Sequence, residues 1–264
     1  MGHHNRHFAG DQYALSGAWS PPTSSANFCE EDYAVTRYLA EFINTLTNLA
    51  YVFFALRYMY GPGSRGILSL RTDFMSISLL VLGVASFAFH ATLLQNFQFG
   101  DELAMIGVVW AILKVLLTTQ RSSAYDGLVN ASLAVVFPLF AAFYVWTGKI
   151  IYHLIGFSIA IALIIARGVY LFYWRRPGFP EAKVREWRVR GRRALILWGV
   201  AYALWNVDLE FCAELRQLRE GLGLPWAWLL EMHGWWHVLT AMSAARFMDI
   251  TREVQVQLKS EKED

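Results

Sequence analysis

Two histidines four residues apart, His233 and His237, are the best candidates in this chain for binding a metal ion. A separation of four places both rings on one face of a helix, where they can hold one ion between them. Two histidines that are hydrogen-bonded in a core would leave the same pattern. A third histidine, His90, ends another apolar stretch and, taken alone, fits an interfacial position better than a ligand. Three imidazoles together would leave tetrahedral zinc one open position, which is the pattern of catalytic zinc.

Hydroxyl and carboxyl groups stand close to His90 in the sequence. Ser86 precedes it by four residues and shares its helical face, and Asp101 and Glu102 open the next apolar stretch. A carboxylate at that place can take the proton of a zinc-bound water. The alternative for Asp101 is an acid favoured at the start of a helix by the macrodipole.

An acidic cluster precedes the first apolar stretch. Glu30, Glu31 and Asp32 are consecutive, and Glu41 follows inside the apolar run. Clustered carboxylates at a junction between a loop and a helix suit calcium, although the EF-hand pattern is absent. The alternatives are a solvated surface, a helix cap, or an ion pair between Glu41 and Arg37, four residues before it.

Seven apolar stretches must position these side chains. Hydrophobic residues make up 56% of the 264 and charged residues only 17%, against about 25% in ordinary globular domains. The composition predicts an all-α integral membrane protein, because a span needs about 20 apolar residues. The predicted spans are 36–59, 73–94, 101–119, 125–146, 150–174, 193–213 and 226–248. Residues 1–35 then form a lumenal segment, 36–250 a seven-helix transmembrane catalytic domain, and 251–264 a charged, solvated cytosolic tail.

The basic residues set the orientation of these spans. They concentrate between 175 and 193, in other loops of the same side and in the C-terminal tail, which predicts a cytosolic C-terminus and a lumenal N-terminus. His90, His233 and His237 then lie at a similar depth in the lumenal half of the bundle, so zinc with a bound water is the preferred interpretation. Cys29 and Cys212 fall at the lumenal boundary, where an oxidising compartment favours a disulfide.

The remaining polar residues carry weaker expectations. His3, His4 and His7 are predicted to be solvated in the N-terminal tail, and His153 to be structural. One of three residues in the sixth stretch, Asn206, Asp208 or Glu210, is expected to orient a ligand histidine. The net charge of +2 gives no indication of nucleic-acid binding, and no cleavable signal peptide is visible.

Taken together, these motifs resemble the alkaline ceramidase family from about Trp19 to about Phe247. The resemblance is carried by Cys29-Glu30-Glu31-Asp32-Tyr33, Ala40-Glu41-Phe42-x-Asn44, Ser86-x-x-x-His90, Asp101-Glu102-Leu103, Trp205-Asn206-x-Asp208, Cys212-x-Glu214 and His233-x-Trp235-Trp236-His237. It implies hydrolysis of ceramide, a membrane lipid, to a sphingoid base and a fatty acid in the endoplasmic reticulum or Golgi membrane. A seven-helix zinc-containing receptor of the adiponectin-receptor type and a transporter are the alternatives. The receptor is usually inverted in the membrane, which the basic loops here oppose.

The resemblance also implies roles for particular residues. His90, His233 and His237 would bind zinc, Asp101 would act as the base and Ser86 would help to stabilise the oxyanion. The calcium positions would be Asn27, Phe28 through its carbonyl, Glu30, Asp32 and Glu41, and the disulfide would join Cys29 and Cys212. This chain has Asn27-Phe28 where the family has Asp-Trp, and Asp32 where it has Asn, so the charge of the calcium site is kept.

Overall fold

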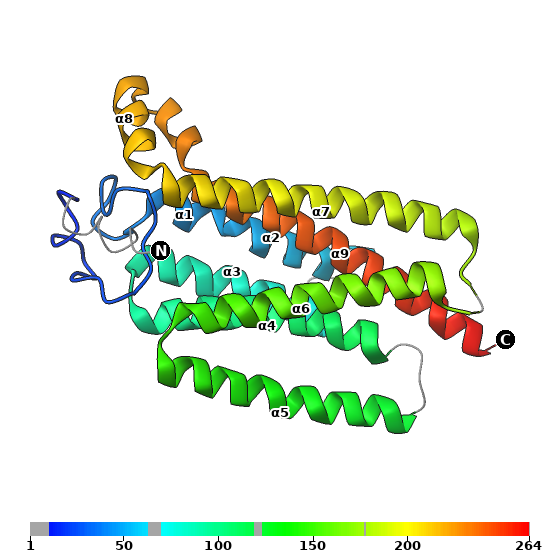
Figure 1. Cartoon of the computed structure of the whole chain (residues 1–264). Coiled ribbons are helices and arrows are strands. Elements are labelled where there is room, and N and C mark those ends of the chain that lie inside the picture. The colour runs from blue at the N-terminus through cyan, green and yellow to red at the C-terminus, as the bar shows by residue number, and fades with distance from the viewer. Residues whose placement is uncertain (1–10, 63–69, 119–122, 177, 264) are drawn as a thin grey trace.

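The long helices lie side by side as a bundle (Figure 1). The computed structural model describes residues 11–62, 70–118, 123–176 and 178–263, so His3, His4 and His7 lie outside it. Within the described residues the protein is all-helical, apart from one isolated bridge between Thr36 and Leu39. The loops before the first helix and the short helix α8 lie at one end of the bundle, and α9 ends at the other (Figure 1).

Nine α-helices follow one another in the described chain. They are α1 (Phe42–Thr47), α2 (Leu49–Met59), α3 (Phe74–Thr92), α4 (Gln95–Thr118), α5 (Ser123–Thr147), α6 (Ile150–Val169), α7 (Glu181–Glu210), α8 (Cys212–Leu222) and α9 (Met232–Glu263). A π-helical turn, η2 (Tyr170–Trp174), continues α6, and a 3-10 turn, η3 (Trp226–Leu230), precedes α9. Helices α7 and α9 pack along each other, and α3 packs between α2 and α4.

The first helix begins later than the predicted start at residue 36. Residues 36–41 are not helical, because the backbone N–H groups of Ala40 and Glu41 donate instead to the carbonyls of Ala91 and His90, at 2.9 and 3.0 Å. Carbonyls at the end of a helix lack partners within it. The segment before α1 therefore provides hydrogen-bond donors for the last carbonyls of α3, and these bonds hold it beside His90.

The helices that contain the last two predicted spans extend beyond the predicted span limits. Helix α7 begins at Glu181 rather than at 193, with Val184 and Trp187 buried in its first turns. Helix α9 runs beyond Ile250 to Glu263, and Val254 and Leu258 are each 2% exposed. The segment after 250 is therefore a packed continuation of α9 rather than a solvated tail, since its apolar side chains recur on one helical face.

Several helices are apolar enough to cross a membrane. Among the described residues, three helices pass by length and composition, Phe74–Thr92, Ala124–Thr147 and Ile150–Trp174, and a fourth passes if α7 and α8, bent by 89°, count as one broken span. Helices α5 and α6 also expose large apolar side chains, such as Leu139 at 65% and Ile159 at 56%. Exposed apolar faces of this extent are unusual on a soluble monomer and indicate association with a membrane.

Candidate functional site

Three histidines meet in the bundle. One ring nitrogen from each of His90, His233 and His237 lies within 4.8 Å of those of the other two. His90 comes from the last turn of α3, and the other two come from the start of α9. All three are buried, with 1–3% of each exposed. Within the described part of the chain, this is the group of potential metal-binding side chains that converges closely enough to hold an ion.

Two of these rings are held through their Nδ1 atoms. His90 Nδ1 hydrogen-bonds to the Glu41 carboxylate, and His237 Nδ1 lies 3.0 Å from the Thr47 hydroxyl. A carboxylate accepts only from a protonated nitrogen, so Glu41 selects the His90 tautomer with the proton on Nδ1. Nε2 then keeps its lone pair for a ligand, an arrangement that is common around metal-binding histidines.

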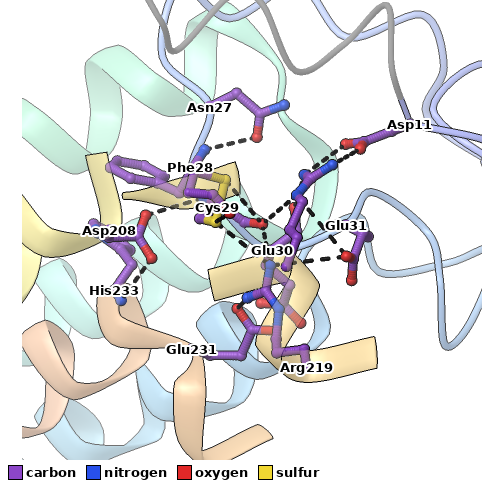
Figure 2. The surroundings of a disulfide bond; sticks show 12 residues. Asp11, Asn27, Phe28, Cys29, Glu30, Glu31, Asp208, Arg219, Glu231 and His233 are labelled. Carbon is purple, nitrogen blue, oxygen red and sulfur yellow. Dashed lines mark hydrogen bonds and ion pairs between the residues drawn. A yellow bond between two sulfur atoms is a disulfide. The ribbon is translucent and has the colours of Figure 1, made fainter. Parts of the chain in front are cut away.

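Asp208 positions the third histidine. It is 1% exposed and accepts hydrogen bonds from the backbone N–H groups of His233, at 3.2 Å, and Cys29, at 3.0 Å. Figure 2 shows its carboxylate between these two residues. Of the three polar residues considered in this stretch, Asp208 is therefore the one that acts on a histidine segment. Asn206 donates to the carbonyl of Tyr202 in its own helix.

Asp101 and Glu102 serve different parts of the site. Helix α4 begins at Gln95, so Asp101 lies inside the helix and the helix-start explanation for it is wrong. The Ser86 hydroxyl lies close enough to interact with the Asp101 carboxylate. Glu102 instead accepts from the Gln98 amide at 3.1 Å and from the Tyr144 hydroxyl. The Asp101 carboxylate therefore has fewer hydrogen-bond partners than that of Glu102 and is the better candidate for proton transfer.

These side chains line a cavity of about 430 Å³. Its wall includes Ser86, Asp101, His233 and His237, and also His153, which is 3% exposed and lies on the cavity rather than in the three-histidine group. A smaller, mainly apolar cavity of about 90 Å³ shares part of this wall. The shared lining residues are Tyr51, Leu82, Met105, Phe157, Trp198 and Trp236. A cavity with polar side chains thus lies next to a mainly apolar one, and the two share part of a wall.

Three carboxylates of the acidic segment, those of Glu30, Asp32 and Glu41, are buried rather than solvated, whereas Glu31 is 40% exposed. Both carboxylate oxygens of Glu30 accept backbone N–H groups at the start of α1, from Ile43 at 2.6 Å and from Asn44 at 2.8 Å. Asp32 accepts from the Asn27 amide at 3.3 and 3.4 Å. Burial raises the pKa of Glu30 and of Asp32 to about 8, with the nearby Glu41 carboxylate adding to both shifts.

Glu41 links this segment to the histidines. Its carboxylate is fully buried and accepts the backbone N–H of Phe28 at 3.0 Å as well as binding His90. The alternative pairing with Arg37 does not form, since Arg37 is exposed and its guanidinium lies over the ring of Tyr38. The ring of Phe28 stacks on His233 with centroids 3.5 Å apart. The N-terminal segment therefore forms one wall of the histidine site.

Comparison with known proteins decides the family. The sequence model of the Ceramidase family matches residues 20–264. The chain belongs to the ceramidase family. Alkaline ceramidase YPC1 of Saccharomyces cerevisiae is 32% identical over 250 residues, covering 87% of this chain and 76% of that protein. Alkaline ceramidase 3 of Mus musculus is 28% identical over 236 residues, covering 86% and 82%. Membership makes the chain a hydrolase and disfavours the receptor alternative.

The two cysteines of this ceramidase are joined. The Cys29 and Cys212 sulfurs lie 2.16 Å apart, at disulfide distance, with Cα atoms 5.2 Å apart. Around them, Arg219 donates to the Cys29 carbonyl at 2.7 Å and pairs with Glu231, and all of these groups are buried (Figure 2). The bond ties the N-terminal segment to the start of α8.

Some functional neighbours in this ceramidase were not expected from the sequence. Thr47, which holds His237, and Gln98 and Tyr144, which hold Glu102, had no assigned role. For Thr47 and Tyr144, a polar residue inside a predicted apolar stretch was the available signal, because such residues usually face the bundle interior. Gln98 lies between the predicted stretches 73–94 and 101–119 and had no such signal. Such a signal does not identify the residue that the side chain contacts, since that residue can lie on another helix.

Removing the disulfide of this ceramidase should destabilise it. The free energy of unfolding of a double Cys29→Ala/Cys212→Ala variant is expected to be about 2–5 kcal/mol lower, because the disulfide closes a long loop of chain. Thermal unfolding of the detergent-solubilised protein under non-reducing conditions should therefore occur at a lower temperature. Peptide mapping should recover the linked pair in the parent. Two freely labelled thiols in the denatured, unreduced parent would contradict the bond.

Proposed function

We propose that this ceramidase hydrolyses ceramides to a sphingoid base and a free fatty acid, using a zinc ion bound by His90, His233 and His237. The observation that carries the proposal is the convergence of these three buried imidazoles, two of which line the same cavity as Asp101 and Ser86, next to an apolar cavity that shares part of its wall. An amide lipid needs both features, a hydrolytic centre and room for a hydrocarbon chain.

The donor set fits zinc. Three neutral imidazoles leave a fourth tetrahedral position open, whereas structural zinc sites are usually closed. The contacts to Glu41 and Thr47 leave Nε2 of His90 and of His237 for the ion. When bound, zinc acts as a Lewis acid and lowers the pKa of water in the site toward about 7.

Asp101 and Ser86 carry the proton transfers in this proposal. Asp101 accepts a proton from the attacking water and returns it to the leaving nitrogen, which converts the amide to an amine and a carboxylic acid. The Ser86 hydroxyl first donates to the Asp101 carboxylate. Once Asp101 is protonated, the same hydroxyl is free to donate to the oxyanion that develops on the substrate carbonyl.

The apolar cavity would take a hydrocarbon chain of the substrate. Its wall is formed by aliphatic and aromatic side chains such as Val109, Ile112 and Phe247. Burial of apolar surface stabilises a chain there by about 0.8 kcal/mol for each methylene group. This contribution would hold the amide at the polar end, where the histidines lie.

The position in the membrane is part of the proposal. Seven spans with a lumenal N-terminus place the histidine site in the lumenal half of the bilayer and the basic residues between 175 and 193 in the cytosol. The disulfide supports a lumenal position for the N-terminal segment, because disulfides persist in oxidising compartments. The endoplasmic reticulum or Golgi membrane fits both conditions.

A calcium ion would bind in the acidic segment, through Asn27, the Phe28 carbonyl, Glu30, Asp32 and Glu41. The supporting observation is that the carboxylates of Glu30, Asp32 and Glu41 are buried close enough to affect one another. A bound cation would offset the repulsion between their negative charges. The Asn44 Oδ1 atom is also buried without a hydrogen-bond partner among the described residues. Carboxylate and amide oxygens are the ligands that calcium prefers.

Calcium should therefore raise the melting temperature of this protein by mass action. Asp32→Ala is expected to weaken that response, because it removes a buried carboxylate. Glu31→Ala is the matched control, since its side chain is 40% exposed. Glu41→Gln is unsuitable because Glu41 also holds His90. If neither calcium nor a calcium-selective chelator changes the melting temperature, the calcium site is excluded.

The proposed activity is tested by incubating purified protein with ceramides of different acyl chains and measuring released fatty acid. Ceramides should be cleaved, whereas sphingomyelin, with its large headgroup, serves as the control that should not be. If no fatty acid is released from any ceramide, the proposal is wrong.

A further inference from the structure

A separate cavity of about 570 Å³ lies toward the opposite end of the bundle from the histidines. It is formed by the end of α2 and the residues that follow it, the first turns of α3, Arg190 of α7 and the middle of α9. Arg246, which lines it, follows His237 on α9 by more than two helical turns. The cavity shares no lining residue with the histidine site.

Positive charge is in excess around this cavity. Five arginines line it together with two acidic residues, Asp249 and Glu253, and two further carboxylates, Asp73 and Glu186, pair with its arginines from outside the wall. The arginines are Arg57, Arg71, Arg190, Arg246 and Arg252. After these pairings a small excess of positive charge remains in the hollow, and it comes from the arginines without a carboxylate partner, which can attract an anion.

Three of these arginines are fixed in place. The guanidinium carbons of Arg252 and Arg71 lie 3.4 and 4.4 Å from the centroid of the Tyr58 ring. Arg252 also donates to Asp73 at 2.7 Å, and Arg190 donates to Glu253 at 2.7 Å. Stacking and ion pairing reduce the rotamer freedom that a ligand would otherwise have to restrict.

The other two arginines are available. Among the described residues, neither Arg57 nor Arg246 has an ion pair or a hydrogen bond. The enrichment of basic residues in cytosolic segments is enough to explain positive charge at this end of the bundle. It does not explain why several arginines line the same cavity. A guanidinium binds phosphate oxygens through two parallel N–H groups, which an ammonium group cannot do.

We propose that this cavity binds a phosphate group at the end of the bundle remote from the hydrolytic site. Arg57 and Arg246 supply the direct contacts, and the stacked and paired arginines supply the surrounding charge. The phosphate comes from an acidic phospholipid headgroup of the adjoining leaflet or from a free phosphate compound. Binding here is independent of ceramide hydrolysis.

The test uses the full chain in nanodiscs and compares two probes. One arm compares phosphatidylcholine discs with discs that also contain phosphatidic acid, and the other adds inorganic phosphate to phosphatidylcholine discs at constant ionic strength. The readout is the melting temperature as the probe is titrated. The test variant is Arg57→Gln/Arg246→Gln. Lys183→Gln/Arg185→Gln removes the same charge from α7 outside the cavity and is the control.

The parent and the control should be stabilised, and the test variant should need about tenfold more probe for each guanidinium removed. Stabilisation by phosphatidic acid alone identifies a lipid headgroup, and stabilisation by inorganic phosphate identifies a free phosphate. Arg57→Gln alone serves if the double variant is unstable without probe. The proposal is overturned if neither probe stabilises the parent, if the test variant responds like the parent, or if the control loses the response equally.

Discussion

His237→Ala is expected to remove most of the bound metal and to reduce ceramide hydrolysis to below about 1% of the parent. Even the loss of a residue that only holds a metal ligand costs about 10–100-fold in affinity or activity, and His237 is proposed as a ligand itself. Its ring centroid lies 4.5 Å from that of His233 and 4.7 Å from that of His90, so no neighbouring imidazole can replace it without moving. Metal analysis and fatty-acid release should be measured on the same preparation.

The matched control is His153→Ala. His153 is equally buried and lines the same cavity, but it does not belong to the converging group. Its variant should keep about one zinc per chain. Full activity in His237→Ala, or equal loss of zinc in both variants, would show that the three-histidine group is not the metal site.

Asp101→Asn should lower kcat by about 10²–10⁴-fold while leaving zinc bound. The substitution keeps the size of the side chain and an oxygen that can face the Ser86 hydroxyl, but an amide cannot accept the proton of the attacking water. Because Asp101 is not among the converging histidines, metal content should be unchanged. A lower kcat with unchanged zinc content would therefore identify Asp101 as a base rather than as a zinc ligand.

Glu102→Gln is the control for this prediction. The adjacent carboxylate is already bound by Gln98 and Tyr144, so its loss should affect stability more than the chemical step. If Asp101→Asn is as active as the parent, or if Glu102→Gln alone abolishes turnover with zinc retained, the roles given to the two acids are wrong.

The meeting of the histidines could be predicted because it depends on local features. The spacing of His233 and His237 defines a shared face, and their depth relative to His90 follows from counting residues along two helices. The contacts that hold the rings could not be predicted. Glu41 reaches His90 only because the segment before α1 crosses the end of α3, and hydropathy contains no information about that crossing.

Helix limits were predicted less well than the presence of helices. An apolar run marks the part of a helix that matches a hydrocarbon layer, not where its hydrogen bonds begin and end. Helix α7 therefore extends into the basic segment from Glu181, and α9 continues past Ile250, since Trp187 and Leu258 find apolar partners there. The basic segment between 175 and 193 is therefore mostly helical, from Glu181 onward.

Zinc titration of metal-free protein tests the central claim most directly. Purified protein is stripped with a chelator, returned to ceramide-containing discs and given increasing zinc, with released fatty acid measured at each step. We predict negligible activity without metal, and activity that rises with added zinc and reaches its plateau near one ion per chain. Full hydrolysis by the stripped protein, with no dependence on zinc, would contradict a zinc-dependent ceramidase.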